Sequence, residues 1–317
     1  MRTPLSDRAR GRWAGLLPLV GVDPRYLSGK QGPCPMCGGK TRFRFDDREG
    51  RGTWICNHCG AGDGADLAMK TTGCDFRVLA ERIDALLGSV PEQTSRRHAS
   101  ADECRQALRR LWRGSSRVTP GDPVALYLAS RVDVSAAPDC IRTVKRLRYQ
   151  DDAPSWHPAM IAMVSAPDGS PATIHRPYLT AEGTKAQVEA PRRLMPGSIP
   201  DGSAVRLFDP APILGIAEGI ETALAASVLF DVPVWAAVSA AMLAKWVPPD
   251  GVGEVIVFGD ADVGFAGQAA AYGLAHRLSS KIARVRVELP RSAGADWNDV
   301  LREARAAGDQ KSHRTGR

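Results

Sequence analysis

The sequence lacks any long hydrophobic segment. Its longest uncharged apolar stretches are residues 222–230 and 232–244, and both are too short to cross a bilayer, which needs roughly 20 residues. The N-terminus, Met1-Arg-Thr-Pro-Leu-Ser-Asp, has no apolar core of the kind that secretory signals contain. These absences predict a protein without membrane segments that works in the cytoplasm.

Acidic residues are scarce at one end of the chain. The 317 residues include 42 Lys+Arg and 35 Asp+Glu, a net charge of +7. Residues 1–117 carry 21 basic and 13 acidic side chains, residues 118–212 carry 10 of each, and residues 213–317 carry 11 basic and 12 acidic. The basic first third predicts a polyanionic partner there and different chemistry elsewhere. A hydrophobic content of 44% excludes wholesale disorder.

Cysteine is also scarce, and an odd total of 7 without an export signal argues against a disulfide framework. Four of the cysteines form two C-x₂-C pairs, Cys34 with Cys37 and Cys56 with Cys59, with 18 residues between the pairs. This spacing predicts a structural zinc site with four thiolate ligands. His58 is an alternative ligand, although it is more typical of the turn between two ligands. Three cysteines have no paired spacing and are interpreted as ordinary small residues: Cys74, Cys104 and Cys140.

The first third predicts a small metal-dependent ribbon. Residues 5–28 indicate one or two short helices, residues 41–45 and 53–55 alternate as strands do, and residues 66–87 indicate a helix. One face of the first strand is basic, which predicts contact with nucleic-acid phosphates through Lys40, Arg42 and Arg44. Phe43 and Phe45 on the other face are expected to form the core of the ribbon, although exposed aromatic rings can also stack on unpaired bases.

A basic amphipathic helix is expected at residues 103–113, with Leu108, Leu111 and Trp112 on its buried side. Residues 120–212 indicate short strands and helices interrupted by proline and glycine. Apolar strands then alternate with helices. The strands are expected at 213–217, 232–238, 254–258 and 285–289, and the helices at 222–230, 240–246, 267–279 and from Trp297 onward. Such alternation predicts a parallel sheet covered on both faces.

Acidic residues follow three of these strands. Glu218 follows the first, Asp260 and Asp262 follow the third, and Asp296 comes after the fourth. The carboxyl ends of parallel strands share one edge, where ligands bind in open α/β sheets. Clustered carboxylates repel one another unless a cation joins them, and oxygen ligands favour Mg²⁺. Each residue alone is also compatible with a helix cap or a turn, so the prediction depends on their common position.

One apparent nucleotide motif is incomplete. Gly39-Lys40-Thr41 resembles the end of a phosphate-binding loop, but the glycine required five positions earlier is Cys34. No other Gly-Lys-Ser/Thr occurs in the chain. The sequence therefore predicts no ATPase motor.

These motifs resemble those of a known family. Glu218-Gly219 and Asp260-x-Asp262 resemble the Toprim domain of bacterial-type primases, topoisomerases and some nucleases. Asp296-Trp-Asn-Asp299 resembles the version found in primases of phages, plasmids and integrative elements. Residues 33–40 and 52–60 look like the zinc-binding domain of primase-helicases. Residues 173–179, with Gly183 and Lys185, resemble the segment that precedes Toprim in the same proteins.

The resemblance implies an α/β protein with an N-terminal zinc ribbon, an α+β middle region and a Rossmann-like Toprim domain. The implied domains are residues 1–87 (ribbon about 30–62), a linker and basic helix at 88–117, a primase-core subdomain at 118–212, Toprim at 213–306 and a disordered tail at 307–317. The implied activity is synthesis of short RNA primers on single-stranded DNA from NTPs, with structural Zn²⁺ and catalytic Mg²⁺ (or Mn²⁺). A replicative helicase would act in trans.

The resemblance also implies roles for individual residues. Glu218 would be a general acid or base or a metal ligand, and Asp260, Asp262 and Asp296 would bind Mg²⁺. Arg176 and Lys185 would contact template or nucleotide phosphates, although either could be only a solvated charge.

Two residues depart from the cellular pattern, because Thr222 and Asn298 stand where acidic residues are usual. A smaller metal shell or weaker polymerisation would follow from these departures. The alternative functions are a Toprim nuclease and a non-catalytic DNA-binding replication adaptor. A topoisomerase is disfavoured, because the chain is too short for a strand-passage gate.

Overall fold

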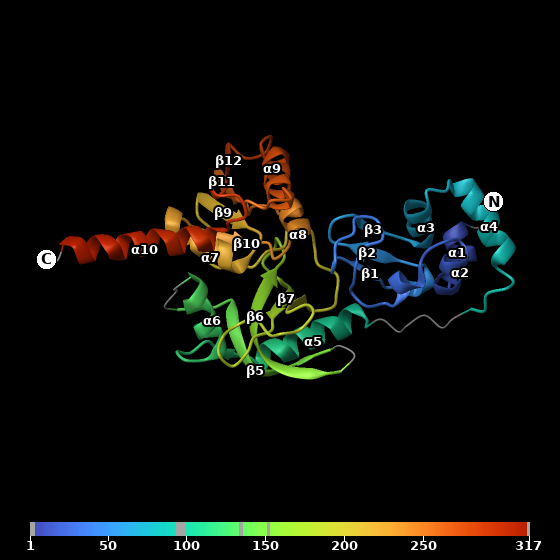
Figure 1. Ribbon diagram of the computed structural model, residues 1–317, viewed down its shortest axis with the longest axis horizontal. Helices are drawn as coiled ribbons and strands as arrows, with labels where there is room; N and C mark the ends of the chain where they lie inside the picture. Colours follow the sequence, from blue (N-terminus) through green and yellow to red (C-terminus); the bar gives the residue numbers. More distant parts are fainter. Residues whose placement is uncertain (1–3, 93–98, 133–135, 151–152, 316–317) are drawn as a thin grey trace. The chain divides into compact units, whose positions relative to one another are not determined.

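A computed structural model describes residues 4–92, 99–132, 136–150 and 153–315, with side chains up to residue 307. The chain forms two compact units, residues 1–98 and 99–317, which are considered separately (Figure 1). Within the described residues, no helix has both the length and the hydropathy to span a membrane.

The first unit is a three-stranded antiparallel sheet surrounded by short helices. The strands are β1 (Phe43–Phe45), β2 (Trp54–Cys56) and β3 (Gly60–Gly62), paired in the order β1-β2-β3. The helices are α1 (Leu5–Arg8), α2 (Trp13–Leu19), α3 (Gly64–Thr72) and α4 (Phe76–Leu86), with 3-10 turns η1 (Pro24–Leu27) and η2 (Arg48–Gly50). The ring of Phe43 stacks on Trp54 with centroids 5.9 Å apart, and both side chains are buried with Trp13. The ribbon therefore shares one core with the helices.

The single helix expected at residues 66–87 is wrong, because α3 and α4 are separate helices. Gly73 ends α3 in the left-handed conformation at φ 72°, which costs glycine little. The side chain of Asp75 then accepts a hydrogen bond from the backbone N–H of Val78 and begins α4. Strand β3 was not expected, since its sequence Gly-Ala-Gly carries no strand signal.

The second unit begins with an antiparallel sheet in the order β4-β5-β6-β7-β8. Its strands are β4 (Ser116–Arg117), β5 (Ile141–Tyr149), β6 (Ser155–Ser165), β7 (Pro171–Pro177) and β8 (Arg192–Leu194). Helix α5 (Ala101–Arg113) packs against one face, where Leu108 joins Ile161. Helix α6 (Pro123–Val132) packs against the other, where Leu128 joins Met160. The prediction of short strands in this region is wrong for β6, which has 11 residues. Because helices cover both faces of the sheet, apolar and polar residues do not alternate along this strand.

A four-stranded parallel sheet completes this unit, in the order β10-β9-β11-β12 (Figure 1). The strands are β9 (Ile213–Ala217), β10 (Val234–Ala236), β11 (Glu254–Phe258) and β12 (Arg284–Glu288). The helices are α7 (Ile220–Phe230), α8 (Ala240–Lys245), α9 (Ala266–Leu278) and α10 (Trp297–Thr315). Ile256 and Phe258 pack with Trp297 on one face, and Val255 and Val257 pack with Leu274 on the other. The predicted parallel sheet with two covered faces is confirmed.

The disordered tail expected at residues 307–317 is not observed as far as Thr315, because helix α10 continues to that residue. No proline follows Pro290, so no residue in this segment is sterically excluded from a helix.

Candidate functional site

The four predicted zinc cysteines come together in the first unit. Their sulfur atoms all lie within 4.8 Å of one another, with 3.8 Å between Cys34 and Cys59 and 3.9 Å between Cys37 and Cys56. A tetrahedral site with Zn–S bonds of about 2.3 Å places its sulfurs about 3.8 Å apart. The donor set and spacing therefore fit a structural zinc ion.

Two turns of the same design present these sulfurs. The backbone N–H of Met36 points to Cys34 Sγ at 3.4 Å, and that of His58 points to Cys56 Sγ at 3.5 Å. The backbone N–H of Gly39 lowers the pKa of Cys37 to about 7, because it stabilises the thiolate. The ring of His58 is exposed and is not part of the cysteine group, so the turn interpretation of this residue agrees with the structure.

The aromatic and basic residues of positions 40–45 differ in burial, as their alternation predicts. Phe43 and Phe45 are buried at 1% and 3% exposure, so they are core residues and their rings are not available to stack on bases. Lys40, Arg42 and Arg44 are exposed, and Arg44 lies 3.7 Å from Asp46. The three basic residues remain a predicted nucleic-acid contact.

A second site lies in the other unit, in a cavity of about 200 Å³ between the parallel sheet and the antiparallel sheet, here called the acidic cavity. Glu218 reaches it from the end of β9, Asp260 from the end of β11, and Asp296 from just before α10. Three of the four predicted acidic residues therefore line one space. This arrangement follows from the parallel sheet, whose strands end at one edge.

The electrostatics of Asp260 show that these carboxylates are close enough to repel one another. Burial raises its pKa, and the charges of Glu218 and Asp296 raise it further, to about 7. The hydroxyl of Thr222 donates to Asp260 Oδ1 at 3.5 Å, so this departure from the acidic pattern still contacts the site. A divalent cation would relieve the repulsion.

Asp262 does not line the acidic cavity. Its Oδ2 accepts a hydrogen bond from the backbone N–H of Gly267 at 2.9 Å, at the first turn of α9, and its side chain is exposed. Among the described residues, the cysteines are the one group of three or more candidate metal ligands with all ligand atoms within 4.8 Å. The acidic residues are thus a looser set, as suits Mg²⁺, which usually keeps water and substrate-phosphate ligands.

Of the two predicted phosphate contacts, Lys185 lines the acidic cavity and Arg176 does not. Arg176 Nη2 instead donates to the backbone carbonyl of Leu194 at 2.8 Å, which links β7 to β8. Two further cations line the cavity, Arg131 from α6 and Arg192 from β8. Sequence reasoning missed both, because no motif marks them and only the packing of the two sheets brings them to the cavity.

A buried pair of side chains completes the cavity wall. Glu221, 8% exposed, accepts a hydrogen bond from the hydroxyl of Tyr127. Burial raises the pKa of Glu221, but this hydrogen bond and the charges of Arg192 and Lys185 outweigh it, so the pKa lies below its usual range. Burial lowers the pKa of His175, another lining residue, to about 4, so its ring is neutral at physiological pH. Sequence reasoning assigned no site role to these residues.

Protein-family models match the two regions of the chain that hold the cysteines and the acidic residues. Residues 29–65 match the zinc-binding domain of primase-helicase, and residues 213–307 match the Toprim domain. Residues 102–207 match a domain family of unknown function, DUF7146. The chain thus combines a zinc-binding domain of the primase-helicase type with a Toprim domain, and the resemblance seen in the sequence is confirmed.

Solved primase structures are similar at low identity. The zinc-binding and RNA polymerase domains of Aquifex aeolicus primase share 14% identity over 96% of this chain and 83% of that chain, with a TM-score of 0.42. The primase fragment of the bacteriophage T7 primase-helicase shares 15% identity over 89% of this chain and 98% of that chain, with a TM-score of 0.40. A Pseudomonas aeruginosa primase domain shares 13% identity over 50% of this chain and 52% of that chain, with a TM-score of 0.35. This chain thus spans about half of that last structure.

Proposed function

We propose that this protein is a DNA primase that makes short RNA primers on single-stranded DNA. The observation that carries the proposal is the acidic cavity, where three carboxylates at a parallel sheet edge face three cations from the preceding subdomain. Carboxylates suit a divalent cation, and Arg and Lys side chains suit the phosphates of an NTP. Phosphoryl transfer requires both kinds of group.

Glu218, Asp260 and Asp296 are the residues that would hold Mg²⁺ or Mn²⁺. A cation held there would supply charge neutralisation for the attack of a primer 3′-hydroxyl on the α-phosphate of an NTP, with pyrophosphate as the leaving group. Arg131, Lys185 and Arg192 would orient the triphosphate. Asp262 Oδ2 accepts a hydrogen bond from the backbone N–H of Gly267, so Oδ1 is the oxygen that it would offer to the metal.

The zinc ribbon would supply the template contact in this proposal. Its exposed cations are Lys40 and Arg42, which lie just before β1, and Arg44 on β1, whose aromatic residues are buried. Such a surface binds phosphates without reading bases. A replicative helicase acting in trans would expose the single strand.

A non-catalytic DNA-binding adaptor is the second candidate. The position of Asp262 favours it, since this carboxylate is engaged with Gly267 at 2.9 Å rather than lining the cavity. The retained Glu218, Asp260 and Asp296 favour the enzyme.

The test combines zinc-loaded protein, single-stranded DNA, labelled NTPs and Mg²⁺. We expect short RNA products from the wild type and none from Asp260→Asn. Asp231→Asn is the matched control, because Asp231 ends α7 outside the acidic cavity, in a left-handed conformation that asparagine also adopts. DNA binding without products would support the adaptor, and shortened DNA would support a Toprim nuclease.

A further inference from the structure

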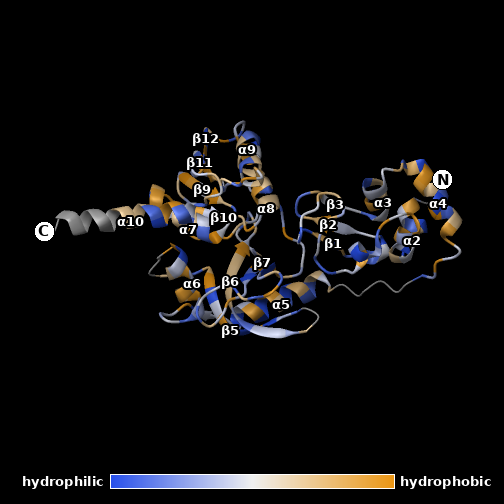
Figure 2. Ribbon diagram, in the orientation of Figure 1, coloured by the Kyte–Doolittle hydropathy of each residue, from blue (hydrophilic) through white to orange (hydrophobic). Residues whose placement is uncertain are grey.

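Helix α5 has one apolar face and one basic face (Figure 2). The apolar face packs on the antiparallel sheet through Leu108, with Leu111 and Trp112 against the same cluster. All the basic side chains of the helix are exposed: Arg105, Arg109, Arg110 and Arg113. None of them is needed to bury the helix on the sheet.

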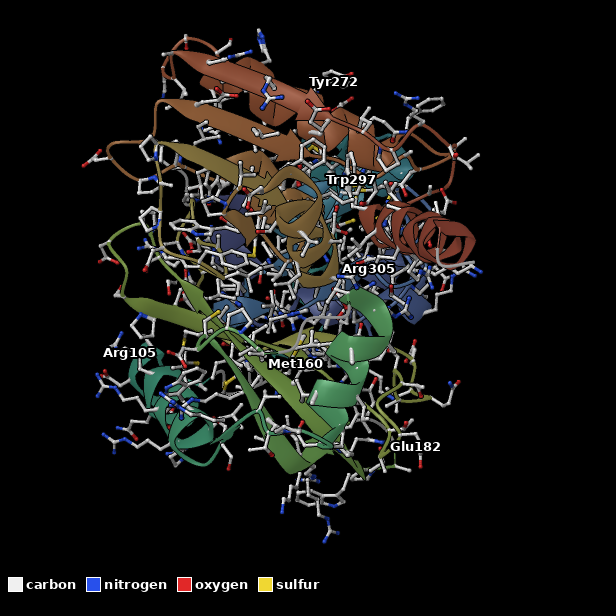
Figure 3. The ribbon with its side chains drawn as sticks, turned by 90° about the vertical axis from the view of Figure 1, so that its left-hand side faces the viewer. Arg105, Met160, Glu182, Tyr272, Trp297 and Arg305 are labelled. Carbon is white, nitrogen blue, oxygen red and sulfur yellow. The ribbon has the colours of Figure 1, made fainter. Side chains whose placement is uncertain are left out.

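Helix geometry places Arg110 and Arg113 on the surface that faces away from the sheet, and Arg105 and Arg109 on the flank of the helix. An α-helix has 3.6 residues per turn, so Arg109 and Arg113 lie one above the other, about 100° and 140° around the helix from Leu108. Arg105 and Arg110 flank that line on either side. Figure 3 shows Arg105 pointing outward from the helix.

Few acidic groups neutralise this surface. Arg105 pairs with Asp102 on the same helix. In the parts of the chain that the structure describes, Arg109, Arg110 and Arg113 have no carboxylate oxygen within 4.0 Å. Like charges three or four residues apart destabilise a helix, and a bound polyanion would remove that cost.

The N-terminus of α5 is capped and its C-terminus is held against the antiparallel sheet, so the arginines sit on a well-stabilised helix. At the N-terminus, Ser100 Oγ accepts from the Glu103 N–H at 3.2 Å and Glu103 Oε2 accepts from the Ser100 N–H at 2.7 Å. At the C-terminus, Arg142 donates to the carbonyl of Trp112 at 3.3 Å and stacks on its ring at 4.3 Å. A rigid helix loses little further entropy when it binds a ligand.

The helix dipole explains only part of this pattern. Cations in the last turn stabilise a helix, which accounts for Arg110 and Arg113. Arg105 and Arg109 lie before the last turn, where the dipole gives no comparable gain. Arg105 is paired with Asp102, so Arg109 is the residue whose position points to an external anion.

We propose that the four arginines of α5 bind the phosphate backbone of single-stranded DNA. The inference rests on the proposed function in one respect, since the strand is taken to be the primase template. α5 is also the first element of the second unit along the chain.

The test measures the affinity of the full chain for labelled oligo-dT across a salt series. The variant is Arg109→Gln with Arg113→Gln, because glutamine has a helix propensity close to that of arginine. Each phosphate contact contributes roughly 0.7 to the slope of log K against log salt for single strands. We therefore expect a slope smaller by about 1.4 and binding at least about tenfold weaker at 50 mM salt.

The matched control is Lys281→Gln with Arg284→Gln, which removes the same charge near the amino end of β12, where both side chains are exposed. It should leave the slope within error of the wild type, and thermal unfolding should show that both variants are fully folded at the temperature of the binding assay. An unchanged slope in the α5 variant, an equal loss in the control, or no binding by the wild type would overturn the proposal. Normal binding without primer synthesis would instead count against the proposed function alone.

Discussion

The cysteine site takes all its ligands from residues 34–59, whereas the acidic cavity collects side chains from Tyr127 to Asn298. The four sulfurs already have the spacing of a tetrahedral zinc shell. The carboxylates are more loosely arranged and repel one another, as the raised pKa of Asp260 shows. The comparison teaches that the chain itself supplies four ligands for a zinc ion at the first site, whereas the metal proposed for the second would also need ligands from solvent and substrate.

Loss of one cysteine should produce the largest effect. Cys56→Ser removes a buried ligand, and structural zinc contributes about 10–16 kcal/mol to the folding of small zinc modules. We expect the zinc content to fall below one per chain and the ribbon to unfold, while residues 99–317 keep their own thermal transition. Metal analysis and calorimetry measure both.

Cys74→Ser is the control for that experiment, because Cys74 lies in the same unit but outside the cysteine group. Retention of one zinc per chain in Cys56→Ser would contradict the four-cysteine assignment.

Loss of a carboxylate from the acidic cavity should raise the stability of the protein, whereas loss of a zinc cysteine should lower it. The folded-state pKa of Asp260 is raised to about 7, so the folded state binds this proton more tightly than the unfolded state. Asp260 therefore lowers stability progressively as the pH rises from about 4 to 7. We expect Asp260→Asn, without added Mg²⁺, to be more stable than the wild type by roughly 2–4 kcal/mol above pH 7.

Thermal unfolding of the zinc-loaded protein between pH 4 and 8 measures that difference. The gap should close near pH 4, and it should shrink at pH 8 when Mg²⁺ is added to the wild type. A gap that does not change with pH would mean that carboxylate repulsion is not its cause.

The buried pair Tyr127 and Glu221 allows the contribution of the cavity wall to the stability of the protein to be measured. Tyr127→Phe removes the hydrogen bond to the Glu221 carboxylate, and a hydrogen bond to a charged group contributes about 1.5–3 kcal/mol. We expect that loss of stability, and the pKa of Glu221 should rise, because its charged form loses a donor. Denaturant unfolding at pH 8 gives the first value; an unchanged midpoint would show that the pair is not stabilising.

The smallest expected effect is a difference in KM between variants of two arginines on neighbouring strands. Arg192→Gln removes a cation that lines the cavity, so the KM for NTP should rise about tenfold, or about 1.4 kcal/mol. Arg176→Gln removes the donor to the Leu194 carbonyl, so it should lower stability and leave KM near the wild-type value. Steady-state primer synthesis by the two variants checks this, and an equal rise in KM would refute the distinction.

Much of the parallel sheet could be predicted from the sequence. Strands β9 and β11 have the predicted bounds, because each is a short, almost wholly buried run, apolar except for Glu254, and an acidic residue follows within two positions of its end. The same reasoning placed Glu218 and Asp260 at one edge. The cysteines were predictable because their ligand spacing is local.

The other wall of the cavity could not be predicted. Arg131 and Arg192 belong to α6 and β8, and they meet Glu218 only after the antiparallel sheet packs against the parallel one. The position of Asp262 outside the cavity has a different cause, since the backbone N–H of Gly267 at the start of α9 donates to its carboxylate. The sequence was compatible with such a turn or cap and with a metal ligand, and did not decide between them.

The most direct test of the difference between the two sites is Mn²⁺ binding to the zinc-loaded protein, measured by electron paramagnetic resonance with and without NTP. If the acidic cavity needs substrate oxygens to complete its metal shell, NTP should tighten Mn²⁺ binding in the wild type at least tenfold more than in Asp260→Asn. Equal Mn²⁺ affinities in the two proteins, with and without NTP, would contradict the account.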